Sequence, residues 1–326
     1  MPKKGLLGLS FPVSVGIVVI FLVLAAINFV SGSLGKSLFG NVGLPSWLSV
    51  SPPHLELPSE TVLHIFGFPI TNSIIGAWLS IIVLVGFAYA VSSRLRLIPR
   101  RWQALLEFML GALLSFCQSV AGEKKGRTFF PIIATIFLFV VFNAWLSLLP
   151  GFGSITIDAA EGKVPLLRGA NTDVNLPLAL AAVSFVFVEY FGIKSLGLRY
   201  LTKFLNVGRF IGSIAQLFKG RFKAGLGGLF SGIIDIFVGV LETLSELIRI
   251  VSFTFRLFGV STAGEILILV GIFLGIRGLI EFFYGLEIIF GLVQAVVFSG
   301  LTLVFVTVAT AGHGAEKESH GATHGG

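Results

Sequence analysis

Long stretches of apolar residues, separated by shorter polar segments, dominate the chain. They cover residues 12–31, 69–91, 129–149, 176–193, about 226–276 and 279–312. An α-helix needs about 20 consecutive apolar residues to cross the hydrocarbon core of a bilayer. Within the bilayer it satisfies its own backbone hydrogen bonds, which an isolated strand cannot do. The pattern therefore predicts an all-α polytopic membrane protein with about five to six membrane helices.

The stretch 226–276 is too long for one straight membrane span, because a helix rises about 1.5 Å per residue. We expect this helix to be strongly tilted or bent, and Gly259 and Gly264 are possible bending points. Only Arg277 and Gly278 separate it from the last apolar stretch. The sequence therefore predicts a long tilted helix hairpin at the end of the chain.

Residues 102–121 have a different pattern, with polar side chains spread among leucines and phenylalanines. Gln103, Glu107 and Gln118 are the polar members that stand out. A mixed segment of this kind favours a helix that lies along the cytoplasmic membrane interface. A full membrane span is the alternative for the same residues.

Charge is scarce and unevenly placed. Of the 326 residues 55% are hydrophobic and 12% are charged, whereas about 25% are charged in ordinary globular proteins. Seven lysines and arginines lie in each of the segments 92–127 and 194–225, against one in 32–68 and two in 151–173. Such an excess marks the cytoplasmic side of a membrane protein. The net charge of +7 therefore reports topology and does not indicate a nucleic-acid partner.

The two ends of the chain differ from the membrane domain. Residues 1–31 combine two early lysines with an apolar core, which fits either a cleaved signal peptide or an anchor helix. We expect an outer loop at 32–68, a membrane channel domain at 69–312 and a disordered cytoplasmic tail at 313–326. The basic loops and the signal-like start favour a bacterial plasma (inner) membrane, with an organelle as the alternative.

Ionisable and amide side chains are concentrated in the last two apolar stretches. They are Asp235, Glu242, Glu246, Arg249, Arg256, Glu265, Glu281, Glu287 and Gln294. A charged side chain at the bilayer centre costs about 2.5–3.5 kcal/mol even on the mildest scale. Such residues normally face the interior of a helix bundle or a water-filled path. This set is therefore the candidate functional site.

The chemistry of these side chains separates their roles. On an ideal helix Glu242, Arg249 and Arg256 lie within about 40° of one another and form a stripe. Arginine does not release its proton, whereas a buried glutamate can exchange protons near neutral pH. Glu242 on one side of Arg256, and Glu265 and Glu287 on the other, thus describe two proton half-paths that do not join.

Three of the remaining charges in the hairpin have simpler explanations. Glu246 and Arg249 lie close to the second basic segment, so we expect them either to lie at the membrane interface or to reach toward it with their charged ends. Glu281 follows Arg277 by four residues, which predicts an ion pair at the end of a loop.

The sequence shows no catalytic machinery. No side chains resemble a nucleophile with its base, and no cysteine or histidine spacing indicates a metal site. The histidines, His54, His64, His313, His320 and His324, all lie outside the predicted membrane helices. We therefore expect no catalytic residue, no metal ion and no cofactor.

The ordered motifs resemble those of one known family. The motifs are Glu242-x13-Arg256-Leu-Phe-Gly-x5-Glu265, Glu287-x6-Gln294-Ala, Phe130-Pro131, Asn143, Leu149-Pro-Gly151 and Thr172-Asp-Val-Asn175. Together they resemble the a subunit of F-type ATP synthases over roughly residues 60–311. The resemblance implies a non-catalytic stator subunit with two offset proton half-channels. These would face a rotating ring of c subunits, beside the b subunits of the peripheral stalk.

The resemblance also implies roles for single residues. Arg256 matches the essential arginine that faces the ring carboxylate, and Gln294 matches a glutamine packed near it. Glu265 and Glu287 match the pair in the outer half-channel, and Glu242 matches the acidic residue of the inner one. Asp173, Asn175 and Asn143 match polar residues that form and support the mouth of the outer half-channel.

The chain departs from the family pattern in three respects. Val260 stands where the family usually has asparagine, and the pair of the outer path contains no histidine. Residues 1–31 and the basic loop 197–228 look like additions.

Other functions remain open at this point. A stand-alone proton-coupled secondary transporter could use the same carboxylates, although we find no internal repeat of the kind such transporters often have. A purely structural scaffold is the third possibility, with Glu265 and Glu287 neutralising Arg256.

Overall fold

The computed structural model of the protein describes residues 11–40, 59–93, 102–149, 151–159, 162–197, 200, 204, 212–213 and 222–311. The predicted disordered tail 313–326 and most of the basic loop 197–228 lie outside these residues. The arginine-rich end of the segment 94–101 lies outside them as well.

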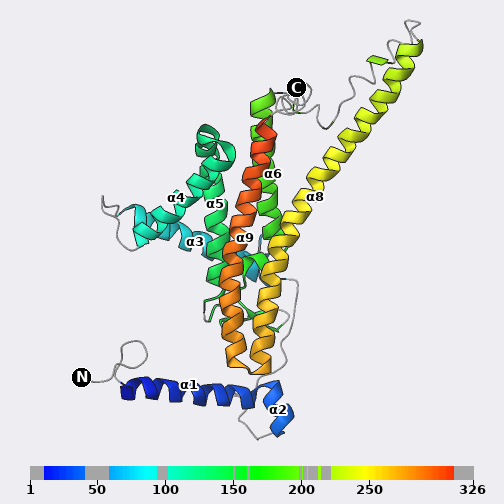
Figure 1. Ribbon diagram of the computed structural model, residues 1–326. Coiled ribbons are helices and arrows are strands. Elements are labelled where there is room, and N and C mark those ends of the chain that lie inside the picture. Colours follow the sequence, from blue (N-terminus) through cyan, green and yellow to red (C-terminus); the bar gives the residue numbers. More distant parts are fainter. Residues whose placement is uncertain are drawn as a thin grey trace, which may run out of the picture.

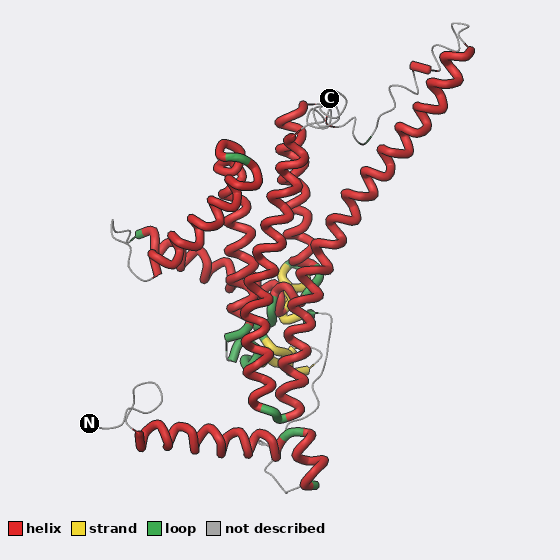
Figure 2. The backbone as a smooth tube through the Cα atoms, in the orientation of Figure 1, coloured by secondary structure: helices red, strands yellow, loops and turns green. Residues whose placement is uncertain are grey.

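Helices make up most of the described chain (Figure 2). They are α1 (Phe11–Ser31), α2 (Ser33–Phe39), α3 (Asn72–Ser92), α4 (Trp102–Ala121), α5 (Glu123–Ser147), α6 (Asn175–Leu196), α8 (Phe222–Leu274) and α9 (Arg277–Ala311). Seven helices in the described part of the chain are long and apolar enough to cross a membrane. They correspond to the six predicted apolar stretches and to α4. The all-α polytopic class is therefore confirmed.

Two short β-hairpins lie largely in segments that the sequence predicted as loops, but the first one extends into the start of the predicted span 69–91, so that the helix begins only at Asn72. Strand β1 (Thr61–Ile65) pairs with β2 (Phe68–Thr71), and β3 (Thr156–Ala159) pairs with β4 (Gly162–Pro165). Phe66 and Gly67 connect the first pair with φ angles of 51° and 82°. Two consecutive positive φ angles belong to the tight turn that matches the twist of a hairpin. A 3₁₀ turn, η3 (Ala170–Thr172), follows the second hairpin and leads into α6.

Helices α5 and α9 form the centre of the bundle. Phe129, Ile133 and Val140 of α5 and Phe298 and Leu303 of α9 are almost completely buried there. Small side chains allow such helices to approach closely in a membrane. Gly291 of α9, for example, faces the Cβ of Ala144 in α5. The hydroxyl groups of Ser184 in α6 and Thr302 in α9 share a hydrogen bond of 2.7 Å, which ties α6 to the same centre.

Helices α8 and α9 form the predicted long hairpin. Helix α8 has 53 residues and is therefore about 80 Å long. It continues without a break through Gly259 and Gly264. Its second half lies beside α9, whereas its first half runs obliquely away from the other helices (Figure 1). The hairpin is thus confirmed, and neither glycine interrupts the helix.

Helix α4 forms a second helical hairpin with α5, and Gly122 supplies the positive φ of 80° between them. Leu113 and Cys117 of α4 are buried in this contact, while Phe108 is exposed. The placement of α4 along the cytoplasmic interface stays a prediction. Helix α1 extends sideways from the closed end of the α8–α9 hairpin (Figure 1), and Gly32, which directly follows α1, lies against the backbone of Gly275 there.

Candidate functional site

A cavity of about 700 Å³ lies between α5, α8, α9 and the segment that carries η3. It is on the side of the bundle where the α8–α9 hairpin turns, close to both β-hairpins. Its polar and ionisable lining residues are Glu60, Asn143, Ser147, Arg168, Asn171, Thr172, Ser261, Thr262, Glu265, Tyr284 and Glu287. The cavity therefore brings together Glu265 and Glu287, which the sequence proposed as a pair.

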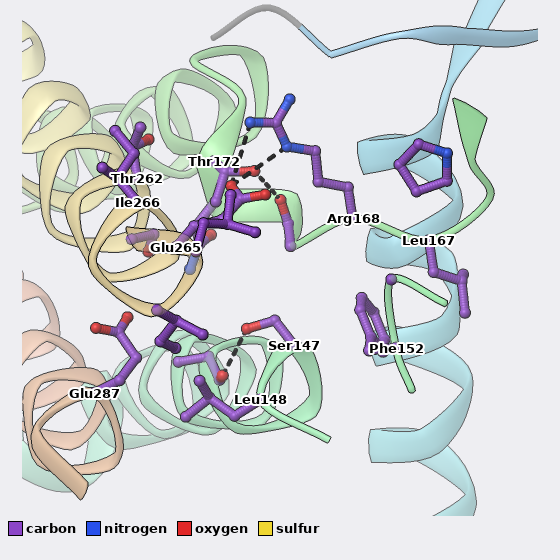
Figure 3. A pocket seen from close by; sticks show the side chains of 18 of the residues that line it. Ser147, Leu148, Phe152, Leu167, Arg168, Thr172, Thr262, Glu265, Ile266 and Glu287 are labelled. Carbon is purple, nitrogen blue, oxygen red and sulfur yellow. Dashed lines mark hydrogen bonds and ion pairs between the residues drawn. The ribbon is translucent and has the colours of Figure 1, made fainter. Parts of the chain in front are cut away.

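Arg168 reaches into this cavity and binds Glu265. Its Nε and Nη2 atoms both donate to Oε2 of Glu265, at 3.3 Å and 3.2 Å (Figure 3). The side chain of Arg168 is 12% exposed and that of Glu265 is 33% exposed. Glu265 is therefore neutralised by Arg168, from the loop before η3. The alternative of a structural network around Arg256 finds no support at Glu265, because the ion pair of Glu265 is with Arg168.

Glu287 occupies another part of the cavity wall, on α9. Its carboxylate lies against the Cα of Gly264 in α8, in the space that a Cβ at this position would need. Within the described residues Glu287 makes no ion pair and no hydrogen bond of its side chain. The two carboxylates thus share one cavity but have different surroundings.

Asn143 supports the cavity from α5. It is buried, and its Nδ2 donates to Oδ1 of Asn171 at 2.9 Å. Its own Oδ1 accepts a hydrogen bond of 3.4 Å from Ser80 in α3. These bonds hold the η3 segment against α3 and α5, so that the backbone beside Arg168 is fixed.

Asp173 and Asn175 are next to the cavity but do not belong to its lining as described. Asp173 accepts hydrogen bonds from Ser59 and from Ser73, the latter at 2.9 Å, and from the backbone and side chain of Asn175. Burial alone would raise the pKa of Asp173, but these hydrogen bonds together lower it below its usual value. The pair therefore anchors the start of α6 to α3, and its role at a channel mouth stays a prediction.

Arg256 lies further along α8, outside the cavity. It is half-buried, and its guanidinium carbon is 5.9 Å from the ring centre of Phe253. Among the described residues it makes no ion pair. Phe253 and Leu257 beside it are buried, while Phe255 is 59% exposed. Arg256 therefore sits at the edge between the packed face and the exposed face of α8.

Gln294 of α9 is 6% exposed, and its Nε2 atom has no hydrogen-bond partner among the described residues. A buried amide without a partner is uncommon, because it loses its bonds to water without replacement.

A second charged cluster lies on the other side of Arg256, toward the first half of α8. Glu246 is 3% exposed and binds Arg249 at 2.6 Å. The guanidinium of Arg249 lies 3.7 Å from the ring centre of Phe305 in α9. Glu246 therefore does not reach the surface, so the expectation that its charged end reaches outward is wrong, while its interfacial position stays a prediction. Glu242, one turn earlier, is half-buried.

Two further polar contacts lie at opposite ends of the helix bundle, one near the Glu246 cluster and one at the turn between α8 and α9. The hydroxyl of Tyr200 donates to Glu189 at 3.1 Å, and burial together with Glu189 raises the pKa of Tyr200. At the opposite end, Arg277 pairs with Glu281 at 3.4 Å on the surface. The predicted pair at the end of the loop is confirmed.

The sequence did not reveal Arg168 or Glu60 as members of the site. Both lie in segments expected to be loops, and Arg168 was counted only as a basic loop residue. The one feature of the sequence that could have indicated Arg168 is its position, five residues before Asp173 in an otherwise uncharged part of the loop. In the described part of the chain no cluster of three or more His, Cys, Asp or Glu side chains could hold a metal ion.

Comparison with known proteins gives a consistent result. A family described as ATP synthase A chain matches residues 74–307. The chain is 26% identical over 253 residues to ATP synthase subunit a of Moorella thermoacetica, covering 77% of this chain and 96% of the relative. It is 29% identical over 256 residues to ATP synthase subunit a 2 of a Bradyrhizobium species, covering 78% and 95%. Subunit a of Gloeobacter violaceus is 29% identical over 247 residues, covering 74% and 85%.

Proposed function

The chain belongs to the ATP synthase A chain family, and we propose that it forms two offset proton half-channels against a ring of c subunits. In this role it couples proton flow to rotary ATP synthesis without catalysing ATP formation itself. Peripheral-stalk b subunits are its expected neighbours in the stator. A bacterial plasma membrane is the proposed location of this multi-pass protein.

The observation that carries the proposal is the cavity with Glu265 and Glu287. It lies away from Arg256, which is on the same helix as Glu265 and makes no ion pair among the described residues. Nine residues separate Arg256 from Glu265, a distance of about 14 Å along α8. A proton that reaches Glu287 or Glu265 can pass to a ring carboxylate that faces α8. Arg256 keeps its own proton, so it stops a proton from continuing directly to the other side.

The inner half-path starts on the opposite side of Arg256. Glu242 lies 14 residues before Arg256, about 21 Å along the helix. It is half-buried, and we propose that protons released from the ring leave past it. Each proton that crosses the membrane contributes about 2.3 kcal/mol per 100 mV of membrane potential. Several protons are therefore needed for each ATP.

The exposed face of α8 offers a surface for the ring. Its exposed apolar residues include Leu241, Leu244, Ile248, Val251 and Phe255. Apolar side chains of this kind pack against other helices or lipid in a membrane. The guanidinium of Arg256 at the edge of this face is suited to a carboxylate on the partner.

Replacement of Arg256 by alanine tests the proposal in the whole complex, reconstituted in vesicles. We expect proton-driven ATP synthesis to be lost while the complex still assembles. Retained synthesis would overturn the half-channel mechanism. Proton-coupled uptake of a solute by the purified chain, without a ring of c subunits, would instead favour a stand-alone transporter.

A further inference from the structure

We infer that Arg168 is a positioning residue of the outer half-channel, which fixes Glu265 as a permanent carboxylate and leaves Glu287 as the group that exchanges protons. This inference rests on the proposed function. It assigns different roles to two carboxylates that the sequence treats as equivalent.

The contact between Arg168 and Glu265 carries the first part. Two N–H groups of one guanidinium converge on a single oxygen, Oε2 of Glu265, at 3.2 Å and 3.3 Å. Arg168 is only 12% exposed, so water screens this pair less than it would screen a surface pair. Arginine stays charged at every pH the protein meets. A proton that bound Glu265 would therefore remove one charge of this ion pair in a mostly buried place.

The surroundings of Glu287 carry the second part. The ionisable groups that face the cavity are Glu60, Arg168, Glu265, Tyr284 and Glu287, whereas α5 contributes only uncharged side chains such as Asn143 and Ser147. Within the described residues Glu287 has neither an ion pair nor a side-chain hydrogen bond. Gly264 leaves room for its carboxylate directly against α8. Glu287 can therefore gain and lose a proton without breaking an existing interaction.

The two roles together limit how much the charge on Arg168, Glu265 and Glu287 changes when a proton passes. The Arg168–Glu265 pair contributes no net charge, and protonated Glu287 contributes none either. Each passing proton then changes the charge on these three side chains by one unit, on Glu287. A second exchangeable carboxylate beside it would add repulsion between like charges whenever both were ionised.

Three single variants and one double variant test this in the reconstituted complex. ATP-driven proton pumping and proton-driven ATP synthesis are measured from pH 6 to pH 9, and subunit content confirms assembly. Glu287→Gln should lower flux by about 100-fold or more, since the exchanging group is lost. Arg168→Gln should lower it by about 10-fold and change its pH dependence, because Glu265 is then freed from its partner. Arg168→Lys should recover most of the flux, since the charge remains.

The double variant Arg168→Gln/Glu265→Gln is decisive. It removes both charges of the pair at once, so its flux should exceed that of Arg168→Gln alone and its pH profile should return toward that of the parent. If the double variant is as inactive as Glu287→Gln, Glu265 itself carries the proton and the inference is wrong. An unchanged pH profile in Arg168→Gln would also overturn it. The Arg256→Ala experiment is independent of these variants, so failure of the proposed function can be told apart from failure of this inference.

Discussion

Gly264→Ala perturbs the cavity at one defined point. A Cβ at Gly264 would come closer than 3.0 Å to the carboxylate carbon and both carboxylate oxygens of Glu287. These atoms form the end of one flexible side chain, so α8 and α9 need not separate. Alanine also favours a helix interior over glycine by about 1 kcal/mol. The variant should therefore fold and assemble, with only the Glu287 carboxylate displaced.

The expected loss follows from the size of this displacement. Ordinary van der Waals contact begins at 3.4 Å, so the carboxylate has to move by about 1 Å or more, and misplacement on this scale can cost roughly 100-fold in rate. We expect proton-driven ATP synthesis to fall by between about 10-fold and 100-fold. The thermal stability of the complex should stay the same or rise slightly.

The assay is ATP synthesis by the reconstituted complex at a fixed pH gradient and membrane potential. Gly285→Ala is the matched control, because it makes the same change in α9 at a position with no atom within 4 Å of the new Cβ. The control should keep the parent rate. Parent-like synthesis in Gly264→Ala would refute the claim that the position of Glu287 against α8 matters for proton transfer.

Two further predictions concern stability, measured by unfolding of the purified chain in detergent. Glu246→Gln breaks the ion pair with Arg249 in a covered site and should lower the free energy of unfolding by about 3 kcal/mol. Glu281→Gln breaks the exposed pair with Arg277 and should lower it by less than about 1 kcal/mol. Equal losses in the two variants would contradict the burial of Glu246. Hydrogen bonds lower the pKa of Asp173 below its ordinary value of 3.8. The ionised form of Asp173 therefore stabilises the fold fully above pH 3.8, and this stabilisation is lost as the pH falls through the lowered pKa. Asp173→Asn should therefore be less stable than the parent at pH 7, and the difference should vanish in acid; a difference that grows in acid would show that the sign is wrong.

The membrane helices could be predicted from the sequence because their cause is local. A run of about 20 apolar residues needs no knowledge of its neighbours to favour a helix in a bilayer. The hairpin of α8 and α9 followed from two such runs with only a short interruption, and the pair of Arg277 and Glu281 followed from helical spacing. The order of charged residues along α8 can likewise be read directly from the sequence. Arg256, Glu265 and Glu242 could therefore be predicted as candidate site residues.

The sequence by itself thus determined the fold class, the long hairpin and the family motifs with their candidate residues. Only the tertiary structure decided which charges meet. Arg168 and Glu265 are 97 residues apart, and Glu287 reaches Gly264 only because α9 turns back along α8. The covered position of Glu246, and the separation of Asp173 from the cavity lining, depend in the same way on how several elements pack. Ion pairs and cavities form between elements that are distant in the chain, so their partners cannot be read from periodicity along one helix.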